Sequence, residues 1–377
     1  MPPRAVVVML DQLSRRCLSC YGHEWIDTPH LDRLASRGVV FDQCFASPMP
    51  ESELHDAALE LADRLRGRGT VVRWLREPDE SDQDDSDELD ELDEKPFARL
   101  VTEAEDVLVD LCRDREASWL LCLESSGIGW PGLPTSQFVE LYANELEDEV
   151  PEELLAIREV EVMYAALLTQ FDHLLGRLLA TVDRLFGESS PLIVLVAAHG
   201  QSVCEAEMLT PFTDQSAEQS EVSGALRDEL VHAPLLIAGA SGETLGSRRQ
   251  DLVTPMDVLP TLGEWFGHAA SSGDARSLIP LLRNEEGDWR SEVVLLDDEG
   301  HAAVRTAEFL YVADRIAAQS LDEQAEPSES LGSLFLKPED VWEVNDVADQ
   351  RPEQVAVLRT VLKDGLSLRS QPVEKQK

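Results

Sequence analysis

The stretch LIVLVAAHG at residues 192–200 decides the fold that we predict for this chain. An apolar, β-branched run that ends in His-Gly is typical of a buried strand whose carboxyl end carries polar groups to a site. A second apolar run, AVVVML at residues 5–10, ends in the same way with Asp11 and Gln12. Because ligands of open α/β sheets bind beyond the carboxyl ends of the strands, we expect Asp11 and His199 to meet at one pocket.

The composition predicts a folded protein without a nucleic-acid or membrane partner. With 377 residues and 43% hydrophobic content, the chain can bury a large core. Its formal net charge of −42 disfavours binding to nucleic acid or anionic membranes, because both need clustered Lys and Arg. No window reaches the roughly 18 apolar residues of a membrane span, and the apolar run behind Arg4 is shorter than that of a secretory signal. We therefore expect a cytoplasmic protein.

The six cysteines do not show the spacing of a disulfide framework or of a zinc site. Cys17 and Cys20 form a lone CxxC, whereas redox and metal-binding proteins combine such a motif with a second one or with a thioredoxin-like context. We expect these two residues to be ordinary, partly buried thiols.

Strands and helices alternate along most of the chain, which is typical of an α/β fold. A Thr-Pro start and a Gly stop delimit a short helix over residues 28–38. The remaining pattern predicts strands at 5–10, 39–41, 70–75, 119–123, 192–197 and 234–238, with helices at 51–66, 97–113, 151–185 and 255–266.

The last quarter of the chain follows a different pattern. Predicted strands at 292–296, 302–306 and 309–313 succeed one another without helices, as in an antiparallel sheet, and a helix at 351–364 follows. We therefore expect a core domain over residues 1–285 and a C-terminal subdomain over residues 286–377.

Residues 77–95 interrupt the core domain with a strongly acidic segment. The sequence EPDESDQDDSDELDELDEK holds twelve acidic side chains and one lysine. Mutual repulsion and the small apolar area oppose independent folding, so we expect a solvated, disordered insertion.

Short motifs occur in a fixed order along almost the whole chain. They are VVVMLD at 6–11, CYG at 20–22, TPHLDRLA at 28–35, GVVF at 38–41, Tyr164 with Asp172 and Gly176, AHG at 198–200, and DVLPTL at 257–262. In order and spacing this series resembles the sulfatase family of the alkaline-phosphatase-like superfamily. The resemblance implies a three-layer α/β/α sandwich with a mixed sheet, a small C-terminal antiparallel sheet plus helix, and hydrolysis of sulfate or phosphate esters at a calcium or magnesium ion.

The nucleophile that this resemblance implies is absent. In the family it lies in a Cys/Ser-x-Pro-x-Arg signature just after the strand that corresponds to residues 39–41. If Pro48 is taken as the proline of the signature, Ala46 stands at the nucleophile and Pro50 at the arginine; if Pro50 is taken, these positions hold Pro48 and Ser52. Neither alignment supplies a nucleophile and a cation.

The metal cage that the resemblance implies is also reduced. Gln12 follows Asp11 where the family has paired acids, and Ala198 precedes His199 where the family has an aspartate. Asp11, Gln12 and His199 are thus a remnant metal site, and we expect no bound cofactor. Residues 201–226 also lack the family's lysine, and residues 125–127, SSG, replace its histidine.

Structural roles compete with these assignments. A lone acid at a strand end often caps a loop, and a lone histidine often forms a hydrogen-bonded wall of a pocket, so Asp11 and His199 each have an alternative to metal binding. Ser52 and His55 lie three residues apart on a predicted helix, a spacing that is common by chance.

Four further motif residues are expected to serve packing and capping. They are Tyr164, Asp172, Gly176 and Asp257. These residues support the fold and not the reaction.

The sequence therefore predicts a sulfatase-like pseudoenzyme with a binding, regulatory or scaffold role. Its partner would be an unidentified protein or an anionic small-molecule ligand. The alternative is an active sulfuric or phosphoric ester hydrolase with a rebuilt metal site. Fold alone does not decide between them, because one fold supports many functions.

Overall fold

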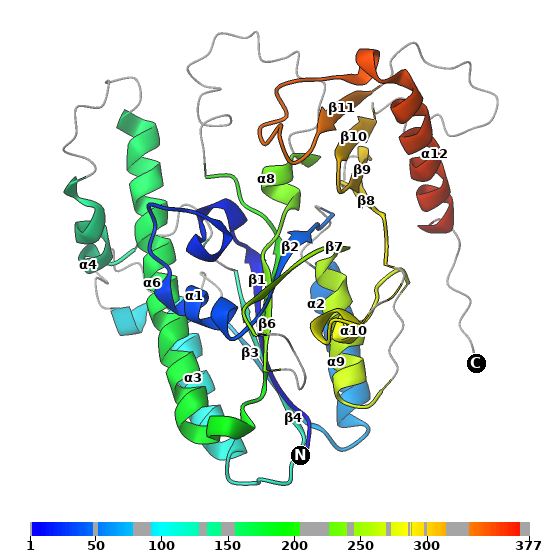
Figure 1. Cartoon of the computed structure of the whole chain (residues 1–377). Helices are drawn as coiled ribbons and strands as arrows, with labels where there is room; N and C mark the ends of the chain where they lie inside the picture. The colour runs from blue at the N-terminus through cyan, green and yellow to red at the C-terminus, as the bar shows by residue number, and fades with distance from the viewer. Residues whose placement is uncertain are drawn as a thin grey trace.

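A seven-stranded mixed sheet forms the centre of the computed structural model (Figure 1). The strands lie in the order β3-β4-β1-β5-β6-β2-β7, and β6 runs antiparallel to both of its neighbours while the other pairs are parallel. The strands are β1 (Arg4–Gln12), β2 (Gly38–Cys44), β3 (Val71–Arg76), β4 (Trp119–Ser125), β5 (Leu192–His199), β6 (Leu235–Ala238) and β7 (Ser247–Val253).

The structure describes part of the chain. The described residues are 2–47, 52–77, 92–126, 128, 134–144, 155–203, 226–239, 245–268, 273–285, 287, 289–297, 300–313 and 332–369.

Helices cover both faces of the sheet, as the predicted three-layer α/β/α sandwich requires. Figure 1 shows α3 (Pro96–Leu111) and α6 (Leu155–Phe186) on one face, with α2 (Ser52–Arg66) and α9 (Val258–Trp265) on the other. The side chains of β1 alternate between two apolar clusters, one on each face of the sheet. A central strand covered on both sides can be apolar throughout, which explains why such runs were recognisable in the sequence.

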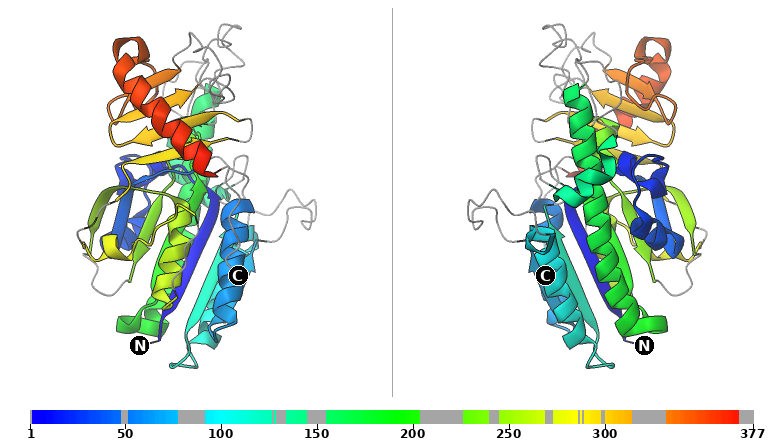
Figure 2. Two further views of the ribbon diagram at one scale, coloured as in Figure 1. Left: turned by 90° about the vertical axis from the view of Figure 1, so that its right-hand side faces the viewer. Right: turned by 90° about the vertical axis from the view of Figure 1, so that its left-hand side faces the viewer.

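The C-terminal part forms a second, antiparallel sheet in the order β11-β10-β9-β8, which confirms the prediction. Its strands are β8 (Glu292–Leu296), β9 (Ala302–Thr306), β10 (Phe309–Ala313) and β11 (Ser333–Leu336), and α12 (Pro352–Arg369) packs on it. Figures 1 and 2 show this sheet beyond the end of the large sheet at which β1 terminates. The expected domain boundary at residues 285 and 286 stays a prediction.

The edge strand β7 is an element that the sequence analysis missed. Its residues SRRQDLV alternate between intermediate and exposed positions before two buried ones, since β7 pairs with β2 alone. An edge strand lacks the continuous apolar run that identifies a central strand, and this one reads as a polar loop.

Both flanks of the acidic insertion make contacts that the structure describes. Glu77 lies at the end of β3, where its backbone N–H donates to Glu124 O at 3.0 Å, and Leu92 packs against the core. Asp93 is paired with Arg177 at 3.0 Å. These contacts hold described residues at both flanks, and the predicted insertion over residues 77–95 stays a prediction. Residues 78–91 lie outside the described residues, where the predicted disorder stays a prediction.

Three of the motif residues act as structural groups, as expected. Asp172 on α6 accepts hydrogen bonds from the backbone N–H groups of His30 at 3.0 Å and Leu31 at 2.8 Å, at the start of α1 (Pro29–Ser36). The Tyr164 hydroxyl accepts the Ser14 N–H at 3.0 Å. A Cβ at Gly176 would lie 2.5 Å from the ring of His30, so any other residue would force that ring to shift.

Asp257 also has the capping role that was expected. It forms a capping box with Thr254 and accepts the Arg276 N–H at 2.7 Å. The Arg290 guanidinium lies 2.7 Å from the same carboxylate, which is fully buried. The DVLPTL motif therefore anchors α9 to the chain that follows it.

The structure also bears on the expected absence of membrane spans and on the CxxC cysteines. None of the helices among the described residues is long and apolar enough to cross a membrane.

Burial raises the pKa of Cys17 to about 11 and that of Cys20 to about 12. Such thiols stay protonated near neutral pH, which confirms that they are ordinary thiols.

The cap formed by Asp172 yields a test of the packing between α6 and α1. Asp172→Ala removes the acceptor of two N–H groups at a helix start, so we expect the free energy of unfolding to fall by about 1–2 kcal/mol. Denaturant unfolding at pH 8 measures this with the carboxylate ionised, since burial raises the pKa of Asp172 to about 6. Glu159→Ala, at an exposed position on the same helix, is the control and should change stability by less than about 0.5 kcal/mol. Equal stability of the two variants would contradict the capping role.

Candidate functional site

The two strand ends singled out in the sequence lie side by side. β1 and β5 are parallel neighbours, and their register pairs Gln12 with His199. The Leu13 N–H donates to His199 O at 3.3 Å and continues this contact past the end of β1. Asp11, one residue earlier, belongs to the same strand end. The two strand ends therefore meet at the carboxyl edge of the sheet, but the register places Asp11 and His199 on opposite faces of it, because side chains alternate along a strand. A pocket shared by the two side chains stays a prediction.

The AHG turn after β5 is fixed by the short helix α8 (Asp228–Val231). The Gly200 N–H donates to Leu230 O at 2.7 Å, and a Cβ at Gly200 would lie 2.3 Å from Glu229 O. His199 Nδ1 lies 2.8 Å from Gly200 O, so this nitrogen carries the proton because a carbonyl can only accept. In the neutral ring Nε2 is then the nitrogen that can accept a proton or a metal.

The donor set at this edge does not fit the calcium or magnesium ion that the fold family implies. The three remnant residues offer one carboxylate from Asp11, one amide from Gln12 and one imidazole from His199. Calcium takes about six to eight oxygen ligands, and both ions favour carboxylates over imidazole nitrogen. Across the described ranges, no group of three or more His, Cys, Asp or Glu side chains is arranged to hold a metal ion.

Of the two nucleophile positions that the resemblance implies, the structure describes Ala46 alone. Ala46 is buried, with 4% of its surface exposed, and its N–H donates to Val231 O at 2.7 Å. Ser52 is the first residue of α2. Pro48 and Pro50 lie outside the described residues. A methyl group at position 46 has no lone pair for attack on an ester.

A polar cluster around Glu124 was missed in the sequence. Glu124 ends the apolar part of β4 and is 4% exposed. Its carboxylate accepts from Trp74 Nε1 at 2.8 Å and from Arg76 Nη2 at 3.0 Å, and His55 Nδ1 lies 2.7 Å away. The His55 contact is at ion-pair distance but is not aligned as a hydrogen bond. An acid at the end of a buried strand was the available signal, as it was for Asp11.

The cluster around Glu124 lies at the same edge of the sheet as Asp11. The register pairs Met9 with Glu124, and Asp11 follows Met9 on the same face of β1 because side chains alternate along a strand. Next to Glu124, the Glu77 carboxylate accepts from the Ser126 N–H at 2.9 Å and from its hydroxyl at 3.0 Å. Burial raises the pKa of Glu77. Ser126, in the SSG stretch that stands where the resemblance implies a histidine, thus hydrogen-bonds a half-buried carboxylate.

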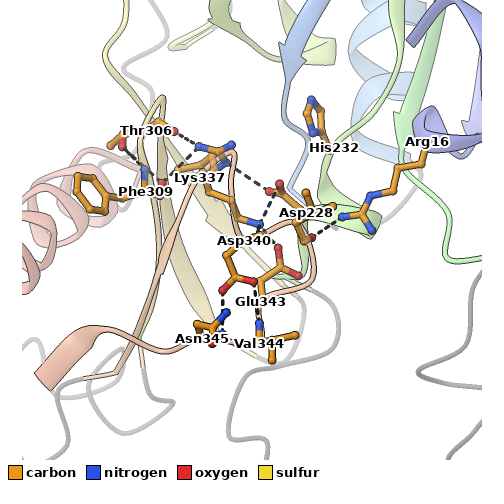
Figure 3. A network of polar contacts seen from close by, with 12 residues as sticks. Arg16, Asp228, His232, Thr306, Phe309, Lys337, Asp340, Glu343, Val344 and Asn345 are labelled. Atoms are coloured by element: carbon orange, nitrogen blue, oxygen red, sulfur yellow. Dashed lines mark hydrogen bonds and ion pairs between the residues drawn. The ribbon is translucent and has the colours of Figure 1, made fainter. Parts of the chain in front are cut away.

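A second charged cluster joins the large sheet to the C-terminal sheet (Figure 3). Asp228 on α8 accepts from Arg305 Nε at 3.3 Å and lies 3.2 Å from Lys337 Nζ. The fully buried Lys337 also contacts Glu343. Burial opposes ionisation of Asp228, but the Arg305 charge, with His232 and Lys337, lowers its pKa to about 2. The carboxylate is therefore ionised at neutral pH.

His232 lies beside this cluster and is held neutral. Its Nε2 lies 2.7 Å from Asp42 O, so this nitrogen donates, and its ring packs on Phe45 with centroids 4.3 Å apart. Burial, with the nearby Arg15 charge, lowers the pKa of His232 to about 3. Protonation of this ring would add a further cation among Arg15 and Arg305.

The lowered pKa of His232 predicts a pH dependence of stability. An unfolded histidine titrates near 6.5, so between pH 6.5 and about 3 the unfolded chain binds the additional proton. The stability that neutral His232 contributes is present above pH 6.5 and is lost as the pH falls. From pH 7.5 to pH 5 we expect a loss of about 2 kcal/mol, which His232→Gln should abolish.

Chemical denaturation of the wild type and of His232→Gln across this pH range measures the free energy of unfolding of each protein. Subtracting one pH profile from the other removes the contribution of the many acidic groups, which both proteins share. His268→Gln, a histidine replacement after α9, should retain the wild-type pH profile. A His232→Gln profile parallel to that of the wild type would contradict the assignment.

Comparisons with known proteins agree with the fold and the motif order. The sulfatase family profile matches residues 76–268. The multifunctional alkaline phosphatase superfamily protein PehA of Trinickia caryophylli is 28% identical over 139 residues, which cover 36% of this chain and 25% of that protein. An N-acetylglucosamine-6-O-sulfatase of Bacteroides thetaiotaomicron is 41% identical over 44 residues, which cover 12% and 8%. The chain thus matches a quarter or less of the length of these relatives.

Solved structures share the fold over nearly their full length. The structure of BT4656 in complex with D-glucosamine-2-N,6-O-disulfate superposes with a TM-score of 0.73 at 15% identity and covers 100% of both chains. The phosphonate monoester hydrolase of Agrobacterium radiobacter superposes with a TM-score of 0.65 at 18% identity, covering 98% of this chain and 96% of that one. Since the sulfatase profile spans more than half of the sequence and the three-layer fold agrees with it, the chain belongs to the sulfatase family of the alkaline-phosphatase-like superfamily.

Proposed function

We propose that this chain keeps the sulfatase fold without ester hydrolysis and acts as a binding, regulatory or scaffold protein. The ligand class is an unidentified protein or an anionic small molecule. The observation that carries this proposal is the set of side chains at the ends of β1 and β5. One carboxylate, one amide and one imidazole lie at the ends of β1 and β5, and buried Ala46 occupies one of the two nucleophile positions.

The chemistry of the reaction explains why this content matters. A dianionic ester repels an attacking oxygen, so hydrolysis needs a nucleophile together with cations that stabilise charge in the transition state. Relative to the family's cage, replacement of two carboxylates by Gln12 and Ala198 removes two negative charges from the metal site. At short distance this loss weakens binding of a divalent cation by several kcal/mol, even with strong screening.

A cytoplasmic location belongs to the same proposal. Five cysteines fall within the described ranges, and all five are free thiols. Unpaired cysteines are the rule in reducing compartments, whereas secreted proteins more often contain disulfides.

The contact between His55 and Glu124 favours one alternative function. An imidazole held 2.7 Å from a buried carboxylate resembles the base and orienting acid of hydrolytic sites, and it lies on the face of the sheet that Asp11 shares. In this alternative the chain is an ester hydrolase with a rebuilt site. Among the described residues, no nucleophile is placed against His55 by a hydrogen bond, so we favour the binding role.

Turnover assays separate the two functions. We expect the purified protein to hydrolyse aryl sulfates, phosphate monoesters and phosphate diesters no faster than a buffer control, because it lacks the nucleophile and its arginine. His55→Gln and Asp11→Ala should leave that background unchanged. Activity that copurifies with the wild type through two columns and disappears in either variant would establish the alternative.

Metal titration tests the remnant site by itself. The acidic segment also attracts cations, so the measurement uses a variant that lacks residues 78–91 and keeps the docked flanks. In calorimetric titrations with calcium and magnesium we expect no micromolar binding, and no difference between this variant and its Asp11→Asn derivative. Micromolar affinity that survives the deletion and vanishes with Asp11→Asn would show that the cation site is intact.

A further inference from the structure

Three exposed apolar side chains follow one another on the loop after β11. Val341 is 41% exposed, Trp342 is 55% exposed and Val344 is 73% exposed. We refer to these three side chains as the apolar loop patch. Other exposed large apolar residues of the described chain are scattered singly: Val109, Leu141, Leu245 and Val357. Single exposed apolar residues are ordinary, whereas a group of them is typical of an interaction site.

The loop that carries the patch is ordered by its own polar contacts. Lys337, 3% exposed, donates from Nζ to Asp340 O at 2.8 Å and also contacts the Glu343 carboxylate. The Asp340 carboxylate accepts the N–H groups of Val344 at 3.0 Å and Asn345 at 2.9 Å (Figure 3). The loop is therefore fixed before a partner binds, and binding does not have to supply the cost of ordering it.

Glu343 has a left-handed backbone between two side chains of the patch. Its φ of 51° costs a residue other than glycine roughly 1–2 kcal/mol. The Glu343 side chain is 4% exposed and turns inward to Lys337, whereas Trp342 and Val344 on either side of it are exposed. Strained residues of this kind cluster at binding sites, and this one leaves two apolar side chains in solvent.

Arg16 holds the ring of Trp342 in place. It belongs to the short 3-10 helix η1 (Arg15–Cys17), which follows the end of β1. Its guanidinium lies over the Trp342 ring, 4.4 Å from the centroid, and its Nη2 donates to Val341 O at 2.7 Å. Figure 3 shows Arg16 reaching toward this loop from the large-sheet side. A tryptophan restrained in this way is a rigid anchor, and tryptophan is enriched among the residues that dominate binding at protein interfaces.

The surroundings of the patch are acidic. Residues 338–350 contain five acids and no Lys or Arg. One of these acids, Glu343, is paired with Lys337. Three others are exposed and form no ion pair with another described residue: Glu339, Asp346 and Asp349. In a chain of net charge −42, the patch is thus an apolar centre with a negative rim.

We propose that the apolar loop patch is a docking surface for a basic protein segment whose apolar anchors are flanked by Lys or Arg. This inference rests on the proposed binding role and names the chemistry of its partner. The apolar centre accommodates the anchors, and the acidic rim attracts the flanking cations. A second copy of this chain would bring an equally acidic rim against the first, and cytoplasmic bilayer surfaces are themselves negative, so both fit less well.

Selection of a random-peptide phage library on the full chain tests the surface, with the affinity of synthetic copies of the enriched peptides measured by fluorescence anisotropy. We expect these peptides to combine apolar residues with Lys or Arg. Trp342→Ser should weaken their binding by about tenfold or more, because it removes the central anchor of the patch.

Leu141→Ser is the control. Leu141 is 63% exposed and lies shortly after α4 (Ser136–Val139), which Figure 1 shows well apart from β11. This variant should bind the peptides like the wild type. Val344→Ser is the matched second variant, because it replaces another exposed aliphatic side chain, and it should weaken binding by about threefold or more. It decides the test if Trp342→Ser does not fold.

Failure to enrich any peptide above the library background would overturn the proposal. Enriched peptides without an excess of Lys and Arg, or affinities unchanged in both patch variants, would do the same. A dimer seen in sedimentation that dissociates in Trp342→Ser would assign the patch to a second copy instead. Binding to phosphatidylserine vesicles that Trp342→Ser abolishes would assign it to a membrane, and either result rejects the basic partner.

The outcome is independent of the turnover assay. Ester hydrolysis by the wild type would overturn the proposed binding role, but it would leave the binding of basic peptides at Trp342 in place. Failure of the apolar loop patch to bind basic peptides would leave the absence of hydrolysis intact.

Discussion

The parallel pairing of β1 with β5 is the constraint on which the rest of the molecule depends. It brings residues nearly two hundred positions apart into register, so that Gln12 faces His199 at the carboxyl edge. Both strands are covered by helices on two faces, and this burial requires nearly continuous apolar sequence. The same burial leaves the strand ends as the place where polar groups can emerge, and α8 and the C-terminal sheet close over that edge.

Burial also explains which parts could be predicted from the sequence. The central strands, the helix caps of Asp172 and Asp257 and the adjacency of the β1 and β5 ends each follow from a local pattern combined with one topological rule. The edge strand β7 could not be recognised, because one neighbour and a solvent-exposed side impose no apolar run. The pairing of His55 with Glu124 depends on how α2 packs on β4, which no local pattern contains.

The two polar clusters differ in how their charges are balanced. Around Glu124, a buried carboxylate is met by Trp74, Arg76 and His55, so its charge is compensated. Around Asp228 and Asp42, the described cations outnumber the described acids that they contact, and among the described residues Arg15 Nε has no hydrogen-bonded acceptor.

One structure determination tests this account most directly. Crystals of the full chain soaked with calcium and sulfate would be measured for anomalous scattering and for density at the ends of β1 and β5. The account predicts no calcium at Asp11 or His199. A calcium ion coordinated by Asp11 and His199, with a sulfate oxygen completing its shell, would contradict the account and show that the catalytic centre has been rebuilt.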